Sequence, residues 1–251
     1  MIFPSDMIEP KIIFEDENIL AVDKPSGLSV HSEGADATGT LVDWFLRHYP
    51  EARGVGEPRV GSDGVQLERS GVVHRLDRDT SGVMILAKNQ PTFDHLKHQF
   101  KERQVKKEYR AIVYGQMKER WGTIDRRIGR SAQDWKLRSA ERGARGQLRD
   151  AVTDWECLKS GTYEGEPFSV LKLDPRTGRM HQLRVHLKSI SRPIVGDSLY
   201  AVGQISRSNN LGLRRLALHA LNIEVELPDG TDRSFAAAWP EELARAETLI
   251  A

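Results

Sequence analysis

Five consecutive apolar residues, Val83 to Ala87, predict a buried β-strand directly after a segment crowded with ionisable and hydroxyl side chains. That segment, Gly71–Gly82, opens with a shorter apolar pair, Val72–Val73. Two strands joined by a loop of chemically capable residues are a usual way for a rigid scaffold to present a site. The pattern therefore predicts either a functional loop or a salt-bridged turn, and by itself it leaves both open.

Composition excludes several classes of protein. No stretch approaches the roughly 18 consecutive apolar residues of a membrane helix, so we expect no integral membrane protein. The N-terminal residues lack a basic region followed by an apolar core, so no secretory signal is expected. Cys157 is the only cysteine, which excludes an internal disulfide and a cysteine-cluster metal site. A cytoplasmic monomer without an obligate protein partner is the default expectation.

Positive charge is concentrated in one part of the chain. Between Lys97 and Asp150 there are 16 Lys and Arg against 7 Asp and Glu, a balance of +9, whereas the rest of the chain has a balance of −8 and the whole chain +1. Segregated positive charge attracts phosphates even in a nearly neutral molecule. A solvated surface with clustered Lys and Arg is the alternative, and the charge pattern does not choose between them.

The spacing of apolar residues predicts one mixed α+β domain, or two lobes of one domain around a cleft. Strands are expected at Ile12–Phe14, Ile19–Val22, Val83–Ala87, Glu108–Tyr114, Val152–Leu158, Phe168–Leu173 and Leu218–Leu227. Helices are expected after the N-cap Thr40, near Pro91, from Arg179 to Ile190 and near Pro240. We expect a long loop over residues 51–70 and an exposed basic loop or hairpin over residues 126–150.

The helix expected at 179–190 has a polar face beside its apolar stripe. His181, Arg184 and Lys188 share the polar face, next to a stripe made of Met180, Leu183, Leu187 and Ile190. A guanidinium at position 184 is suited to a bidentate pair with a carboxylate. The residues alone favour a surface helix with ordinary charges.

Four segments together resemble the RluA-type pseudouridine synthases, in the order of that family's motifs. His74-Arg75-Leu76-Asp77, with Thr80-Ser81-Gly82 after it, resembles the signature loop, and His74 in place of Gly resembles the RluA type more than the RsuA type. The other three segments are Lys24–Leu28, Lys107–Ala111 and Arg176–Leu187 followed by Pro193–Asp197. Four ordered motifs are a strong signal.

The resemblance implies an α+β pseudouridine synthase fold with a mainly antiparallel mixed sheet, flanking helices and a central active-site cleft. It also implies the roles of three residues: Asp77 as catalytic carboxylate, Tyr109 as the active-site tyrosine and Arg184 as the ion-pair partner of Asp77. Such a carboxylate attacks the ribose, or removes a neighbouring proton, in a site without water, so burial must be offset by a nearby Arg to keep it ionised. The uridine must leave its stack to reach it. No metal or cofactor enters this chemistry.

RNA is the partner that the resemblance implies. Candidate RNA contacts come from two of the motif segments and from the basic stretch: His74, Arg75, Arg78, Thr80, Arg126, Arg127, Arg130, Arg179, His181 and Gln182. Arg75 is suited to fill the gap left by the flipped base or to hold a phosphate. Ribosomal RNA is favoured over transfer RNA because Asp77–Gly82 resembles the ribosome-directed members.

The resemblance covers residues 11–227, so we expect a single catalytic domain over 1–251 without a separate N-terminal RNA-binding domain. Two alternatives stay open. An RNA-binding protein with the same fold and no activity would also use the basic region. A glycosyl-bond hydrolase needs two cooperating carboxylates and must admit water, which fits less well. A protein kinase is excluded because the Leu insertion breaks the His-Arg-Asp pattern and no Gly-rich loop precedes it.

Overall fold

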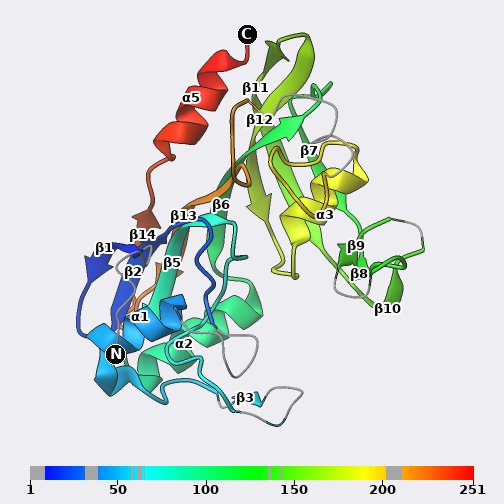
Figure 1. Ribbon diagram of the computed structural model, residues 1–251. Coiled ribbons are helices and arrows are strands. Elements are labelled where there is room, and N and C mark those ends of the chain that lie inside the picture. The colour runs from blue at the N-terminus through cyan, green and yellow to red at the C-terminus, as the bar shows by residue number, and fades with distance from the viewer. Residues whose placement is uncertain are drawn as a thin grey trace. The chain divides into compact units, whose positions relative to one another are not determined.

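The computed structural model describes residues 9–31, 39–57, 59–60, 64, 66–134, 137–141, 143–201 and 211–251 (Figure 1). The chain divides into two compact units. Unit 1 comprises Met1–Lys106 and Asn222–Ala237, and unit 2 comprises Lys107–Leu221 and Ala238–Ala251. The single catalytic domain expected from the sequence stays a prediction.

Unit 1 is built on antiparallel strands. Strand β2 (Ile19–Lys24) pairs with β1 (Lys11–Glu15) on one side and with β5 (Ser81–Ala87) on the other. The β1–β2 turn is closed by the Asp16 carboxylate, which accepts the amides of Asn18 and Ile19 at 2.7 and 2.8 Å. Strand β5 is buried along its whole length, as the apolar run Val83–Ala87 within it predicts. In this unit β14 (Asp232–Ala236) pairs with the second half of β13 (Leu218–Glu226).

Two capped helices accompany these strands. Helix α1 (Leu41–His48) starts at Thr40, where the Thr40 and Asp43 side chains cap each other's backbone amides, and the short 3₁₀ helix η1 (Pro50–Ala52) follows it. Helix α2 (Gln90–Glu102) starts at the N-cap Asn89 and packs against β5. The predicted long loop 51–70 contains η1 and a short antiparallel pair, β3 (Arg59–Val60) and β4 (Gln66–Leu67), and parts of it lie outside the described residues.

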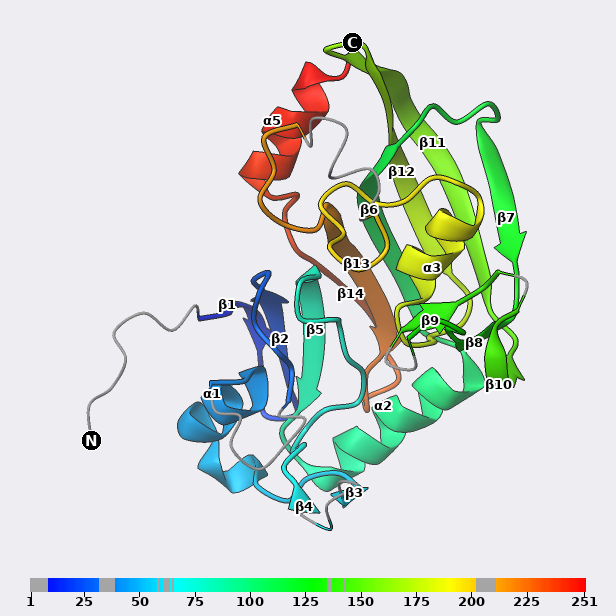
Figure 2. The ribbon, with the colours of Figure 1, turned by 45° about the vertical axis from the view of Figure 1, so that its right-hand side comes forward.

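Unit 2 contains antiparallel strands in the order β6 (Lys106–Tyr114), β12 (Glu166–Pro175), β11 (Val152–Tyr163) and β7 (Trp121–Asp125). Helix α3 (Gln182–Ser189) lies against one face of β11 and β12 in both ribbon views (Figures 1 and 2). Its Leu183 and Leu187 enter the core with Ile112 and Leu171 of the sheet. Helix α5 (Glu241–Leu249) lies at the end of the chain, and Ala251 exchanges backbone hydrogen bonds with Thr162 of β11.

A small three-stranded sheet in unit 2 replaces the basic loop or hairpin expected at 126–150. Its strand order is β10 (Arg145–Arg149), β8 (Ile128–Arg130) and β9 (Arg138–Ser139). Every residue of β10 is exposed. We call residues 126–149 the basic sheet.

The α+β class, the strands and the helix starts at Thr40 and near Pro91 and Pro240 are confirmed. Two local predictions are wrong. Val72 makes only an isolated bridge to Leu86, so no full strand precedes the loop. The helix expected from Arg179 starts at Gln182, because His181 takes a left-handed conformation with φ 56°, and Met180 is therefore 44% exposed and lies outside the core. No helix in the described part of the chain is both long and apolar enough to cross a membrane.

Candidate active site

The backbone of the loop Gly71–Gly82 is fixed at its entry by a glycine. Gly71 has φ 74°, and a Cβ there would lie 2.6 Å from the carbonyl oxygen of Ala87, so only glycine fits without displacement. The Ala87 amide donates to the Gly71 carbonyl at 2.9 Å. Further along, the Thr80 amide donates to the Asp77 carbonyl at 3.1 Å and closes a turn. Asp77, half-buried, therefore sits at the start of a closed turn rather than on a free loop.

The Lys24–Leu28 turn clamps the backbone just after Asp77. Lys24 is completely buried, and its ammonium donates to the carbonyl oxygens of Pro25, Leu28 and Arg78 at 2.9, 2.8 and 3.0 Å. The Gly27 amide donates to the same Arg78 carbonyl at 2.9 Å, and the Ser26 hydroxyl to the Asp79 carbonyl at 2.7 Å. These bonds join two sequence motifs that are distant in the chain, since Lys24 and Arg78 are 54 positions apart and Ser26 and Asp79 are 53. The Lys-Pro-Ser-Gly turn therefore holds the backbone of the loop that carries Asp77.

We expect Lys24→Met to lower both stability and activity. The substitution removes the three hydrogen bonds of the buried ammonium, one of them fully buried, and the free energy of unfolding should fall by about 3 kcal/mol. In the protein that remains folded, kcat should fall more than KM rises, because the clamp holds the turn of Asp77 rather than the RNA. Urea denaturation and steady-state kinetics check both effects. Lys11→Met, at an exposed position of β1, is the control, and equal behaviour of the two variants would contradict the clamp.

His74 and Arg75 are held by protein contacts in unit 1. The His74 Nε2 accepts the Ile85 amide at 3.0 Å, and its ring stacks on Phe100 with centroids 4.7 Å apart. Arg75 is exposed, and its Nη1 donates to His31 Nε2 at 2.9 Å. His74 therefore ties the loop to β5 and α2, a role that its value as a family marker did not indicate.

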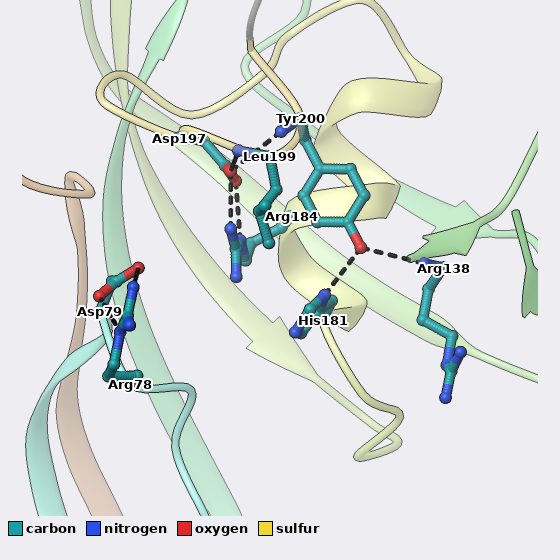
Figure 3. Close-up of polar contacts among 8 residues, drawn as sticks. All are labelled: Arg78, Asp79, Arg138, His181, Arg184, Asp197, Leu199 and Tyr200. Carbon is teal, nitrogen blue, oxygen red and sulfur yellow. Dashed lines mark hydrogen bonds and ion pairs between the residues drawn. The ribbon is translucent and has the colours of Figure 1, made fainter. Parts of the chain in front are cut away.

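Arg78 and Thr80, also candidate RNA contacts, differ in access. The exposed Arg78 guanidinium pairs with Asp79 at 3.0 Å (Figure 3). Thr80 is 2% exposed, which argues for a structural role in the turn rather than an RNA contact.

Arg184 of unit 2 is buried, and two of its guanidinium nitrogens bond one carboxylate. It is 3% exposed, and its Nε and Nη2 donate to the two carboxylate oxygens of Asp197 at 2.8 and 2.7 Å (Figure 3). The Asp197 carboxylate also accepts the amides of Leu199 and Tyr200, both at 3.0 Å. The surface position favoured by the residues alone is therefore wrong. Asp197 takes two of the five guanidinium donors and sets the plane of Arg184.

Asp197 pairs with Arg184, and the sequence motifs assigned it no role. Gly196 before it has φ 75°, and a Cβ there would collide with the Arg215 carbonyl oxygen, so the chain can make this turn only with glycine. The signal in the sequence was this Gly-Asp pair downstream of a helical Arg. Asp77 belongs to unit 1 and Arg184 to unit 2, and their pairing stays a prediction.

Tyr200 connects the helix α3 to the basic sheet within unit 2. Its ring centre lies 5.0 Å from the Arg184 guanidinium carbon, and its hydroxyl is 2.7 Å from His181 Nδ1 (Figure 3). The same hydroxyl accepts the Arg138 amide of β9 at 3.1 Å. His181 is half-buried beside this contact. The position of β9 is therefore coupled to the residues that surround Arg184.

Gln182 and Arg179 support the start of α3. Gln182 is 4% exposed and its amide group bonds Thr177 at 2.7 Å and the Val152 carbonyl at 3.0 Å, so it is a structural residue and not an accessible RNA contact. Arg179, partly exposed, donates through Nε to the Asp150 carbonyl at 3.0 Å.

Tyr109 lies on β6, opposite Leu173 of β12, and packs half-buried against the core of unit 2. Among the described residues there is no group of three His, Cys, Asp or Glu side chains that could hold a metal ion. The site residues offer carboxylate, phenol and guanidinium chemistry.

The basic sheet is anchored to α3 through Arg126, and its strand β10 is exposed along its whole length. The Arg126 guanidinium donates to the Ser189 carbonyl at the end of α3 at 2.7 Å, and its own carbonyl is 3.0 Å from His186 Nε2. Burial lowers the pKa of His186, so the ring is neutral and its Nε2–H donates to that carbonyl. Arg127 pairs with Asp150 on the surface at 2.9 Å, and Arg130 is exposed.

Comparison with known proteins agrees with this fold. Residues 18–189 match the family model described as RNA pseudouridylate synthase. The chain is 41% identical over 189 residues to an uncharacterized RNA pseudouridine synthase of Aquifex aeolicus, covering 75% of this chain and 55% of that protein. It is 36% identical over 231 residues to a protein of Borreliella burgdorferi named ribosomal large subunit pseudouridine synthase D, covering 92% and 65%. The chain thus spans less than two thirds of the length of these relatives.

Solved structures give the same result. Human RNA Pseudouridylate Synthase Domain Containing 1 superposes with a TM-score of 0.72 at 26% identity, covering 94% of this chain and 86% of that one. The chain belongs to the RNA pseudouridylate synthase family.

Proposed function

We propose that this protein isomerises specific uridines in structured RNA to pseudouridine, with Asp77 as its catalytic carboxylate. One observation carries the proposal: the turn of Asp77 is closed on itself and clamped from behind by Lys24, Ser26 and Gly27, within a family-matched segment. A half-buried carboxylate on a rigid turn is suited to act on a bound group, because its orientation does not have to be acquired during the reaction.

The reaction breaks the bond between ribose and the uracil nitrogen, rotates the base, and rejoins it through carbon 5. Carbon 5 loses its hydrogen as a proton, and the nitrogen released from the ribose takes up a proton. Asp77 either attacks the anomeric carbon or removes a neighbouring proton, and both routes require the ionised form. We assign Arg184 to keep that carboxylate ionised, and its buried pair with Asp197 supports this role by holding the guanidinium in one orientation. Tyr109 is assigned to stack on the uracil or to assist proton removal at carbon 5.

Ribosomal RNA is the substrate that we favour, with transfer RNA next. Several relatives, at 33–36% identity, carry the name ribosomal large subunit pseudouridine synthase D. We propose that the two units act as one catalytic domain and that no other chain is needed for the reaction.

The direct test is to incubate the purified protein with a ribosomal RNA transcript and to analyse the digested nucleosides. We expect pseudouridine to appear in proportion to enzyme and time. Tight binding of RNA that stays unmodified would favour the alternative, an RNA-binding protein that has kept the fold without activity. Release of free uracil would instead indicate a glycosyl-bond hydrolase.

Reversing the charge of Arg126, Arg127 and Arg130 together to Glu is expected to weaken RNA binding. These exposed side chains of the basic sheet are suited to phosphate contacts, and the slope of log affinity against log salt should fall by about one unit for each phosphate that is no longer neutralised. Fluorescence anisotropy over a salt series measures it. The matched control reverses Lys118, Arg120 and Arg245, which are exposed elsewhere in unit 2. The same weakening in both variants would mean that only net charge matters and that the basic sheet is not the RNA path.

A further inference from the structure

A cavity of unit 1 lies directly beside the loop that carries Asp77. It has a volume of about 120 Å³ and is lined by His74 and Arg75 of the loop and by residues from elsewhere in the unit: His31, Glu57, Arg69, Val72, Val73, Phe93 and Lys97. A single water needs about 10–15 Å³ of such a volume, so the cavity has room for a group the size of a phosphate. All the described residues that line it belong to unit 1.

The lining combines an apolar wall with an excess of positive charge. Among the described lining residues, Arg69, Arg75 and Lys97 contribute three cations against one carboxylate, that of Glu57, a formal balance of +2 when both histidines are counted as neutral. Phe93 is 2% and Val73 7% exposed, so the wall between these charges is formed by buried apolar side chains. A low-dielectric wall strengthens the attraction of an anion to nearby cations.

Two contacts within the cavity are ones that an anion can join or exchange. Arg75 Nη1 donates to His31 Nε2 at 2.9 Å, and because a guanidinium only donates, this His31 nitrogen accepts and carries no proton. Lys97 Nζ is 3.4 Å from the Glu57 carboxylate, with the two side chains 35% and 53% exposed. An ion pair as exposed as this contributes about 0–1 kcal/mol, so a phosphate can replace the carboxylate beside Lys97 at little cost.

The cavity is also close to the proposed reaction. Arg75 precedes Asp77 by two residues, so their Cα atoms are at most about 7 Å apart. A phosphate held beside Arg75 therefore lies within a nucleotide or two of a uridine at Asp77. A cavity that recognised a nucleobase would need hydrogen-bond acceptors and donors in one plane. The described lining of this cavity offers mainly charged donors.

We propose that this cavity binds one backbone phosphate of the RNA substrate next to the target uridine. The proposal rests on the function proposed above, since it takes RNA as the substrate. Lys97 and Arg69 supply the charge, and Glu57 opposes it. The site thereby determines which nucleotide of the RNA strand faces Asp77.

Opposite charge changes at the cavity give opposite expected results. With a fluorescein-labelled uridine-containing hairpin of ribosomal RNA, Lys97→Gln and Arg69→Gln should each raise the Kd roughly tenfold and lower the salt slope by about one unit. Glu57→Gln should lower the Kd. Lys101→Gln, one turn further along α2 and outside the cavity, is the matched control and should leave both quantities unchanged.

A second measurement identifies the bound group. A set of the same hairpins is prepared, each with one neutral methylphosphonate linkage. At one linkage the neutral group should weaken binding by the wild type but should not weaken binding by Lys97→Gln any further. Weaker binding by Lys97→Gln with an unchanged salt slope, or without any such linkage, would overturn the phosphate assignment. Capture of inorganic phosphate at constant ionic strength more tightly than the hairpin would overturn its assignment to RNA.

The two proposals fail in different ways. If wild type forms pseudouridine while Lys97→Gln, Arg69→Gln and Glu57→Gln bind the hairpin as wild type does, the cavity proposal alone is wrong. If wild type neither binds the hairpin nor forms pseudouridine, the proposed function is wrong and the cavity proposal with it.

Discussion

Asp77→Asn is expected to abolish pseudouridine formation while RNA binding stays within about twofold of wild type. The amide is isosteric with the carboxylate but neither attacks the anomeric carbon nor removes a proton, so kcat should fall by roughly 10³-fold or more. The backbone contacts that hold the turn, from Thr80 to the Asp77 carbonyl and from Lys24 to the Arg78 carbonyl, do not involve the changed side chain. Single-turnover kinetics with saturating enzyme separate the chemical step from binding.

Asp79→Asn is the matched control for this experiment. Asp79 lies two residues further on in the same turn, and its carboxylate pairs with Arg78 at the surface, a contact worth about 0–1 kcal/mol. Its activity should stay close to wild type. Equal activity of Asp77→Asn and wild type would remove Asp77 from the mechanism, and equal losses in both variants would mean that the turn is sensitive to any change.

Asp197→Asn is expected to destabilise unit 2 and to reduce activity in the fraction that stays folded. Arg184 is 3% and Asp197 1% exposed, and removing one charge of a buried pair costs about 3–5 kcal/mol because the other charge stays buried without compensation. For a protein of this size that corresponds to a fall in Tm of roughly 10 °C. An Arg184 that is no longer held in one plane should also lower kcat.

The control is a second Asp–Arg pair of the same geometry on the surface. The Arg176 guanidinium makes a two-point contact with Asp154, with side chains 64% and 30% exposed. Asp154→Asn should cost about 1 kcal/mol or less and leave kcat unchanged. Thermal denaturation and kinetics of the two variants decide the question: a stability loss in Asp197→Asn no greater than in Asp154→Asn would contradict the role of Asp197.

Local features of the fold were predictable because they depend on neighbouring residues. Thr40 and Asn89 cap their helices with side chains that reach only three residues ahead, and the apolar run Val83–Ala87 forms β5. The four motifs were sufficient to identify the family.

The contacts that hold the candidate site were not predictable in the same way, because each joins residues far apart in the chain. The bond from Lys24 to the Arg78 carbonyl spans 54 positions, and a sequence pattern does not indicate that a lysine will be completely buried. The surface helix favoured for Arg184 was wrong for a similar reason: the spacing of polar residues does not reveal the Asp197 carboxylate that permits burial. The helix start expected at Arg179 was wrong because the left-handed backbone of His181 leaves no mark in apolar spacing.

The most direct test of the account is the fate of the hydrogen on carbon 5 of uridine. Ribosomal RNA prepared with tritium at that position should release one tritium to water for each pseudouridine formed by the wild-type protein, and none with Asp77→Asn. Release and product must rise together, because carbon 5 takes the new bond to ribose. RNA that is bound but keeps all its tritium, or free uracil that appears with its tritium intact, would contradict the assignment of this protein as a pseudouridine synthase.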